Sequence, residues 1–406
     1  MFHWPGIRVY CCAVATASGL KKIALLYFDA GGGHRAAAQA LQRAIALQQR
    51  PWDVCLVNLQ EILLPLDPFR RLLGLNLQEI YNQLLRRGFT LGAPQLLKLL
   101  HGLIRLRHRA LVQCLGTYWQ ARPFDLVVSL VPNFNRAIHQ SVRQAMPGVP
   151  SVTILTDLAD YPPHFWIEPD TPAVICGTPC AAAQAAAVGL PPERIYTVSG
   201  MILDPRLYDG DETATAPRSK QSEVRAELGL QPSLATALVL FGGFGSNLML
   251  TIVRRLRRAR LPLQLILVCG HNARLERRLR RLAVRSPMPM RVEGFSRDIP
   301  LLMAAADFMI GKPGPGSLSE AVRSRLPLIV MSNAWTLPQE RYNAAWIREH
   351  ELGLVVRSFR RIAPAARRLL DENERARMRA RAAAFDNRAV WEIPEILARR
   401  LASVDG

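Results

Sequence analysis

The chain has 406 residues, of which 50% are hydrophobic and 21% are charged, a globular composition that excludes an intrinsically disordered chain and leaves room for two domains. Its formal net charge is +20 and its pI is about 10.6. This charge favours a phosphate-bearing partner, unless it only reflects an arginine-rich proteome.

Residues 1–20 are interpreted as an extension that precedes the first strand rather than as a signal peptide, and no apolar run reaches the roughly 18 residues of a membrane span. The seven cysteines are scattered and form no CxxC pair. We therefore expect reduced packing residues in a cytosolic protein and no zinc site.

Strand-like and helix-like segments alternate through the first half of the chain, which predicts an α/β fold with parallel strands. A glycine turn at 31–33 separates the first strand from an alanine-rich helix at 34–48. The strands of this first sheet are predicted at residues 23–28, 53–57, 125–130, 151–155, 173–176 and 195–198.

The segment from 60 to 120 has no strand signal and mixes leucines with basic and aromatic residues. Two interpretations remain open: a basic amphipathic insertion that lies on a membrane surface, or ordinary core helices with solvated arginines. The residues concerned are Phe69, Arg70, Arg71, Tyr81, Arg86, Arg87, Phe89, Lys98, Arg105, Arg107, Arg109, Tyr118 and Trp119.

A second set of strands is predicted at 237–241, 263–268, 290–293, 307–310, 326–331 and 353–356. We expect a first domain at 1–203, a linker at 204–222, a second domain at 223–380, and a C-terminal helix at 381–406 that can pack back on the first domain. The fold class is thus α/β, with two facing Rossmann-like domains and a cleft between them.

The glycine turn before His34 predicts a functional site at the strand ends of the first domain. A helix N-terminus disfavours the imidazolium form, so the His34 ring stays neutral and can take a proton. Gly32 and Gly33 form the adjoining loop, and the polar and aromatic run at 156–166 contains Asp157. Asp157 suits either a sugar or acceptor site or a helix cap.

Residues 311–320 place a glycine-rich turn between a strand and a helix start, which is typical of a phosphate site. Glu320 lies about one turn into that helix, where a carboxylate could hold ribose hydroxyls. A similar loop at 242–246 is a weaker signal. A sugar nucleotide offers both a phosphate and ribose hydroxyls, and the candidates for binding one are Gly242, Gly243, Gly245, Ser246, Gly314, Gly316, Ser317, Glu320, Gln339, Glu340 and Asn343.

Two clusters of arginines, at 254–260 and 277–281, are interpreted as solvated helix faces. No nucleic-acid-binding motif accompanies these arginines, so we do not expect a nucleic-acid partner.

Taken together, residues 31–41, 156–166, 268–272, 294–295, 312–320 and 339–343 resemble the monogalactosyldiacylglycerol synthases, which are inverting family 28 glycosyltransferases of the GT-B fold. The resemblance runs from about residue 23 to 356. The sequence departs from that family at Val131-Pro132, where the family has His-Pro, and in its loop at 242–246. It thus resembles a bacterial side branch.

The resemblance implies a UDP-hexose donor, a lipid acceptor such as diacylglycerol, and no metal or cofactor. It makes residues 1–203 the acceptor-side, membrane-facing domain and residues 223–380 the UDP-sugar-binding domain. His34 and Asp157 would be catalytic, and Phe295 would cover the uracil. Gly242, Gly243, Gly245, Ser246, Gly314, Gly316 and Ser317 would meet the phosphates, Glu320 the ribose, and Gln339, Glu340 and Asn343 the sugar. The enzyme would act as a peripheral hexosyltransferase on the cytoplasmic face of an anionic membrane. A UDP-sugar 2-epimerase and an inactive membrane-surface relative are the alternatives.

Overall fold

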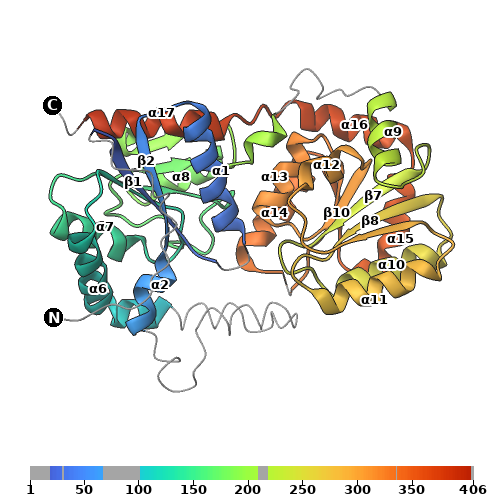
Figure 1. Cartoon of the computed structure of the whole chain (residues 1–406), viewed down its shortest axis with the longest axis horizontal. Coiled ribbons are helices and arrows are strands. Elements are labelled where there is room, and N and C mark those ends of the chain that lie inside the picture. Colours follow the sequence, from blue (N-terminus) through green and yellow to red (C-terminus); the bar gives the residue numbers. More distant parts are fainter. Residues whose placement is uncertain (1–18, 30–31, 67–100, 209–217, 335, 404–406) are drawn as a thin grey trace. The chain divides into compact units, whose positions relative to one another are not determined.

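The computed structural model describes residues 19–29, 32–66, 101–208, 218–334 and 336–403 (Figure 1). In these residues the chain forms two compact units: unit 1 contains 19–205 and 388–403, and unit 2 contains 206–387. Several sequence predictions lie outside the described residues: the extension at 1–18, Gly31, the middle of the linker at 209–217, and the stretch from Phe69 to Lys98 of the basic segment.

Unit 1 is built on a six-stranded parallel sheet with the order β2-β1-β3-β4-β5-β6. The strands are β1 Lys21–Tyr27, β2 Trp52–Asn58, β3 Leu126–Ser129, β4 Ser151–Ile154, β5 Val174–Cys176 and β6 Ile195–Thr197. The helices are α1 Gly33–Leu47, α2 Leu59–Leu63, η1 Leu64–Leu66, α6 His108–Ala121, α7 Asn135–Ala145, α8 Pro179–Ala187, η2 Pro192–Arg194 and α17 Ala389–Ala402.

The described part of the basic segment supplies core helices to unit 1. Tyr118 and Trp119 are buried in α6, and the Trp119 indole donates to Ser141 Oγ on α7 at 2.9 Å. The membrane-surface interpretation is therefore wrong for these two aromatic residues, because the inward face of an amphipathic helix carries them. Arg105, Arg107 and Arg109 are exposed, as both interpretations require.

A buried histidine links α7 to β4 in unit 1. His139 is 1% exposed, and its two ring nitrogens lie 2.8 Å from the hydroxyl oxygens of Ser151 and Thr153. Desolvation lowers the pKa of His139 to about 4, with a smaller opposing effect from Asp170. The folded protein therefore holds His139 neutral at a pH where the unfolded chain, with a histidine pKa near 6.5, binds a proton.

We expect the stability of unit 1 to fall as the pH drops from about 6.5 to 4, because protons bind the unfolded state more tightly in this range. The lowered pKa of His139 corresponds to about 3 kcal/mol, and the loss ends once the pH passes below about 4. Urea unfolding of the wild type and His139→Gln between these pH values checks this. An equally steep pH dependence in the variant would contradict it.

Unit 2 repeats the architecture with the parallel order β12-β11-β10-β7-β8-β9. Its strands are β7 Ala235–Leu240, β8 Leu263–Val268, β9 Met290–Glu293, β10 Phe308–Gly311, β11 Leu328–Met331 and β12 Gly353–Val356. The short helix η3 Pro205–Leu207 lies at the boundary between the units. The helices of unit 2 are α9 Arg218–Glu227, α10 Leu248–Arg258, α11 Ala273–Val284, α12 Ile299–Ala304, α13 Pro315–Arg323, α14 Pro338–Glu349, η5 Phe359–Arg361, α15 Ile362–Arg368 and α16 Glu372–Ala383. The predicted α/β class with two Rossmann-like domains is confirmed.

Helix α9 begins at Arg218, inside the stretch expected to be a linker. The local sequence has few apolar residues and so gives no helix signal, because the helix is held to unit 2 by a buried polar side chain. Arg225 is buried and donates to Asp307 Oδ2 at 2.7 Å and to the Ala305 carbonyl at 2.8 Å.

Helix α17 belongs to unit 1 and packs against α1, as Figure 1 shows. The Gln48 side chain at the end of α1 donates to the Trp391 carbonyl at 3.0 Å, and Glu392 accepts from the Ser199 backbone N–H at 2.8 Å. The chain therefore returns to unit 1 after completing unit 2.

Each sheet has one point at which the strand order reverses. In unit 1, β2 and β3 lie on opposite sides of β1, and in unit 2, β8 and β10 lie on opposite sides of β7. Ligands of doubly wound sheets bind beyond the carboxyl ends of the strands at such a point. The turn before His34 follows β1, while the loop at 242–246 follows β7 and the turn at 312–314 follows β10. The predicted turns therefore lie where this fold places its ligands.

Candidate functional site

In unit 1 the site is built around His34. Gly32 caps α1 with a φ of 84°, a left-handed conformation that glycine adopts without strain, and His34 is the second residue of the helix. Its Nδ1 lies 2.8 Å from Thr156 Oγ1, beyond the carboxyl end of β4. Gly33 is exposed beside it.

The surroundings of His34 keep its ring neutral. Desolvation lowers its pKa to about 4, and a hydrogen bond with the Leu130 backbone only partly opposes this. An imidazole in this state can accept a proton throughout the physiological pH range.

Asp157 is linked to Trp166, whose ring lies near His34. Its Oδ2 accepts from the Trp166 indole at 2.9 Å, and the Trp166 ring lies 5.7 Å from the His34 ring, centroid to centroid. Asp160 fixes the same loop by accepting from the backbone N–H groups of Trp166 at 2.7 Å and His164 at 3.1 Å. The structure thus places Asp157 behind Trp166, and its catalytic role stays a prediction.

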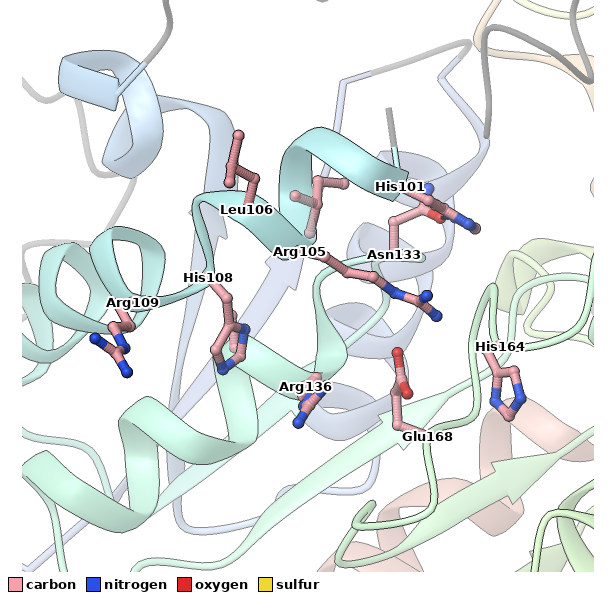
Figure 2. Close-up of a pocket in the computed structure, with 11 residues that line it drawn as sticks. His101, Arg105, Leu106, His108, Arg109, Asn133, Arg136, His164 and Glu168 are labelled. Atoms are coloured by element: carbon pink, nitrogen blue, oxygen red, sulfur yellow. Dashed lines mark hydrogen bonds between the residues drawn. The ribbon is translucent and has the colours of Figure 1, made fainter. Parts of the chain in front are cut away.

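A pocket of about 480 Å³ also lies in unit 1. Figure 2 shows the side chain of Arg105 directed toward Glu168, with Arg136 and His164 on either side of this carboxylate. Burial raises the pKa of Glu168, and His164, Arg136 and Arg105 oppose the rise. The remaining lining residues are His101, Ile104, Leu106, His108, Arg109, Asn133 and Ala137.

The pocket is positively charged and shares the loop at 160–168 with the surroundings of His34. Three arginines and a single carboxylate line it, and no ion pair joins them in the part of the chain that the structure describes. Sequence reasoning missed the pocket because its wall joins segments that lie far apart along the chain.

In unit 2 the structure brings the two glycine turns together around Lys312. A Cβ atom on Gly242 would lie 3.7 Å from Lys312 Cε, and one on Gly314 would lie 3.4 Å from it. Lys312 Nζ pairs with Glu340 Oε1 at 2.7 Å, and Glu340 is only 7% exposed. Asn343 adds a second link from α14 by donating to the Pro313 carbonyl at 2.8 Å.

The loop after β7 is locked against the loop after β8. Gly245 has a φ of 57°, and a Cβ there would lie 2.5 Å from the Cys269 carbonyl oxygen. Gly270 has a φ of 59°, and a Cβ there would lie 2.1 Å from the Gly243 carbonyl oxygen. Glycine is required at both positions, so that the two backbones can approach. Ser246 Oγ accepts from the Leu248 N–H at 3.2 Å and helps to start α10.

Phe295 follows β9 and lies at the surface. Its ring stacks on His271 with a centroid separation of 4.1 Å and an interplanar angle of 16°, while 54% of the residue stays exposed. Phe244 lies 6.1 Å from the same imidazole. An exposed aromatic ring of this kind can cover a planar base.

The other predicted donor residues lie along the starts of α13 and α14. Gly314 caps α13, Ser317 Oγ donates to the Gly314 carbonyl at 3.4 Å, and a Cβ on Gly316 would meet no atom within 4 Å. Glu320 and Gln339 are half-buried on α13 and α14. The first backbone N–H groups of a helix lack partners within it, so the start of α13 offers donors for an anion.

Sequence reasoning left Lys312, Thr156 and His271 out of the site. Lys312 was visible between two glycines of the predicted turn. The contacts of Thr156 and His271 depend on loops after different strands, and neither residue type gives a signal by itself. The predicted residues therefore gather into two sets, one in each unit.

The fold defines the class of protein. The chain matches the crystal structure of Acinetobacter baumannii MurG with a TM-score of 0.59 and 13% sequence identity. The match covers 94% of this chain and 99% of the MurG chain. It also matches UDP-GlcNAc 2-epimerase from Neisseria meningitidis bound to UDP-GlcNAc, with a TM-score of 0.60 and 12% identity over 94% of this chain and 100% of that one. The chain thus has the GT-B fold of paired Rossmann-like units.

Residues 237–391 match the glycosyltransferase family 28 C-terminal domain. The chain is 28% identical over 363 residues to a probable chloroplastic monogalactosyldiacylglycerol synthase of Nicotiana tabacum, covering 84% of this chain and 63% of that protein. The chain is 26% identical over 377 residues to the chloroplastic monogalactosyldiacylglycerol synthase of Spinacia oleracea, covering 88% of this chain and 67% of that protein. Residues 237–391 thus form a family 28 C-terminal domain, and most of the chain is similar to the monogalactosyldiacylglycerol synthases. The chain spans less than two thirds of the tobacco relative's length.

Proposed function

We propose that this protein transfers a hexose from a UDP-sugar to the hydroxyl group of a lipid, with inversion and with diacylglycerol as the acceptor. The meeting of the two glycine turns around Lys312, at the switch point of unit 2 and within the family 28 domain, carries this proposal. The monogalactosyldiacylglycerol synthases among its relatives support the lipid acceptor.

On the donor side, the N–H groups at the start of α13 would bind the diphosphate beside Gly314, Gly316 and Ser317. They would stabilise the charge that develops on UDP as it leaves, so this account needs no metal or cofactor. Glu320 would hold the ribose and Phe295 the uracil. The Lys312–Glu340 ion pair fixes the direction of Glu340, which together with Gln339 would hold the sugar.

On the acceptor side, His34 would remove the hydroxyl proton as the acceptor oxygen bonds to the anomeric carbon of the sugar. The bond from that carbon to the UDP oxygen breaks on the opposite face, and UDP leaves. The positive pocket beside the loop at 160–168 would hold the polar end of a lipid. No helix in the described residues is both long and apolar enough to cross a bilayer. We propose peripheral binding at the cytoplasmic face of an anionic membrane.

Replacing Glu320 with alanine is expected to raise the KM for the UDP-sugar about 10- to 100-fold, as loss of hydrogen bonds to a charged group does, and to change kcat less. Isothermal calorimetry with UDP should show the same loss of affinity. Glu349→Ala, at the far end of α14, is the control. An unchanged KM and UDP affinity in the Glu320 variant would contradict the ribose role.

The alternative enzyme is a UDP-sugar 2-epimerase, because a solved epimerase shares this fold. An epimerase acts without lipid and releases a free sugar, whereas the proposed transferase releases UDP only when a lipid acceptor is present. Incubating the protein with UDP-hexoses or UDP-N-acetylglucosamine without lipid separates the two activities. Failure to bind UDP at all would instead favour an inactive relative.

A further inference from the structure

Unit 2 carries a concentrated positive surface on α10 and α11. We call it the arginine face, and it consists of Arg254, Arg255 and Arg258 on α10 with Arg277, Arg278 and Arg281 on α11. All six residues are exposed. Between residues 248 and 285 the sequence has no lysine and a single carboxylate, Glu276. This surface is therefore built from one kind of charged side chain.

The two helices present these arginines on the same side of unit 2. Strands β7, β8 and β9 follow one another in a single direction, and right-handed crossovers then place both connecting helices on one face of the sheet. Val253 and Leu256 of α10 and Leu279 of α11 belong to one buried cluster, so both helices pack on the same core. Figure 1 shows α10 and α11 side by side.

The arginine face lacks the counter-charges that other arginines of unit 2 have. Among the described residues, the arginines between 248 and 285 make a single ion pair, which joins Arg280 to Glu276 at 2.8 Å. On α16, by contrast, Arg377 pairs with Glu374 at 3.4 Å and Arg381 with Glu351 at 2.8 Å. An arginine-rich composition therefore does not by itself explain the unpaired face.

The spacing of these arginines works against the helices that carry them. Arg254 and Arg258, and likewise Arg277 and Arg281, are like charges four residues apart, an arrangement that destabilises a helix. A polyanion placed against the face would remove this repulsion. Guanidinium groups also bind phosphate in a bidentate manner, which lysine does not match.

We propose that the arginine face binds the phosphate groups of an anionic lipid bilayer, as a membrane contact of unit 2 separate from the pocket of unit 1. Val284 is 87% exposed and Leu248 is 36% exposed at the ends of the same helices, where apolar side chains can enter the interface. No Phe, Tyr or Trp occurs between residues 248 and 285, so the face lacks the stacking platforms of single-stranded nucleic-acid sites. These features favour a bilayer over a nucleic acid.

The test compares two full-length variants that lose the same charge. One carries Arg254→Gln, Arg258→Gln and Arg277→Gln on the arginine face. The control carries Arg348→Gln, Arg377→Gln and Arg381→Gln on α14 and α16. Each is mixed with vesicles of phosphatidylcholine containing about 30 mol% phosphatidylglycerol, and with pure phosphatidylcholine vesicles, and bound protein is measured by sedimentation.

We expect the face variant to bind the anionic vesicles at least about tenfold more weakly than the wild type, since each arginine near an anionic surface contributes about fivefold. The control variant should stay within about threefold, and the difference should shrink at high salt. Equal losses in the two variants, or no loss in either, would overturn the proposal. If the face variant binds vesicles as the wild type does but no longer binds single-stranded RNA, the partner of the arginine face is a nucleic acid instead. Because the readout is binding, failure of the proposed transferase activity leaves this result standing.

Discussion

Replacing His34 with alanine is expected to lower kcat about 10²- to 10⁴-fold, the usual effect of removing a general base. The Thr156 and Leu130 contacts hold the ring in place, and its neutral form can accept a proton. Steady-state kinetics with a UDP-hexose and a lipid acceptor measure the effect. His350→Gln, at the end of α14, is the control for the loss of a histidine elsewhere. A His34→Ala enzyme with kcat within about threefold of wild type would exclude the base role.

The lowered pKa of His34 also predicts how activity depends on pH. Because burial lowers the pKa of His34 to about 4, the ring loses its proton-accepting form only as the pH falls toward that value. The acidic limb of the kcat/KM profile, which reports the free enzyme, should therefore lie near pH 4 rather than near the ordinary histidine value of 6.5. A limb at 6.5 would show that His34 titrates as an exposed histidine in the free enzyme.

Replacing Asp307 with alanine is expected to destabilise unit 2 by about 3–5 kcal/mol, because it leaves a buried charge without its partner. Asp307 Oδ2 accepts from Arg225 Nη2 and from the Thr236 N–H, each at 2.7 Å, and both side chains of the ion pair are under 10% exposed. The carboxylate lies immediately before β10, the strand that leads to the turn around Lys312. UDP binding should be lost together with stability.

Chemical unfolding with hydrogen exchange of peptides from β7 and β10 measures this loss in the unit concerned. The double variant Arg225→Met with Asp307→Leu should be less destabilised than Asp307→Ala, because it removes both charges. Arg368→Met, which breaks a half-exposed pair with Glu374, should cost less than about 1 kcal/mol. Equal effects of Asp307→Ala and Arg368→Met would contradict this account.

The sequence was sufficient to predict the strands and the glycine turns because these signals are local. Buried parallel strands are continuous apolar runs, and a turn such as 311–316 is marked by its glycines. The order of the strands then places the ends of β1, β7 and β10 at switch points without further information.

Contacts between distant segments could not be predicted in the same way. The Lys312–Glu340 pair spans 28 residues, and the His34–Thr156 contact spans 122. Both depend on how loops after different strands pack. For a related reason the direction of Trp119 stayed open between two interpretations, and the helical start at Arg218 was missed. In each case a polar or basic local sequence is held by buried partners that its own composition does not show.

The most direct test of the proposed function is to incubate the purified protein with labelled UDP-hexoses and vesicles containing diacylglycerol, and to analyse the extracted lipids by mass spectrometry. We expect a hexosyl-diacylglycerol whose mass exceeds that of the acceptor by one hexose residue, and proton NMR of the product should show an anomeric configuration opposite to that of the donor. The product should be missing with His34→Ala. Turnover of the UDP-sugar with no lipid-linked sugar, or an equal yield from the His34 variant, would contradict the account.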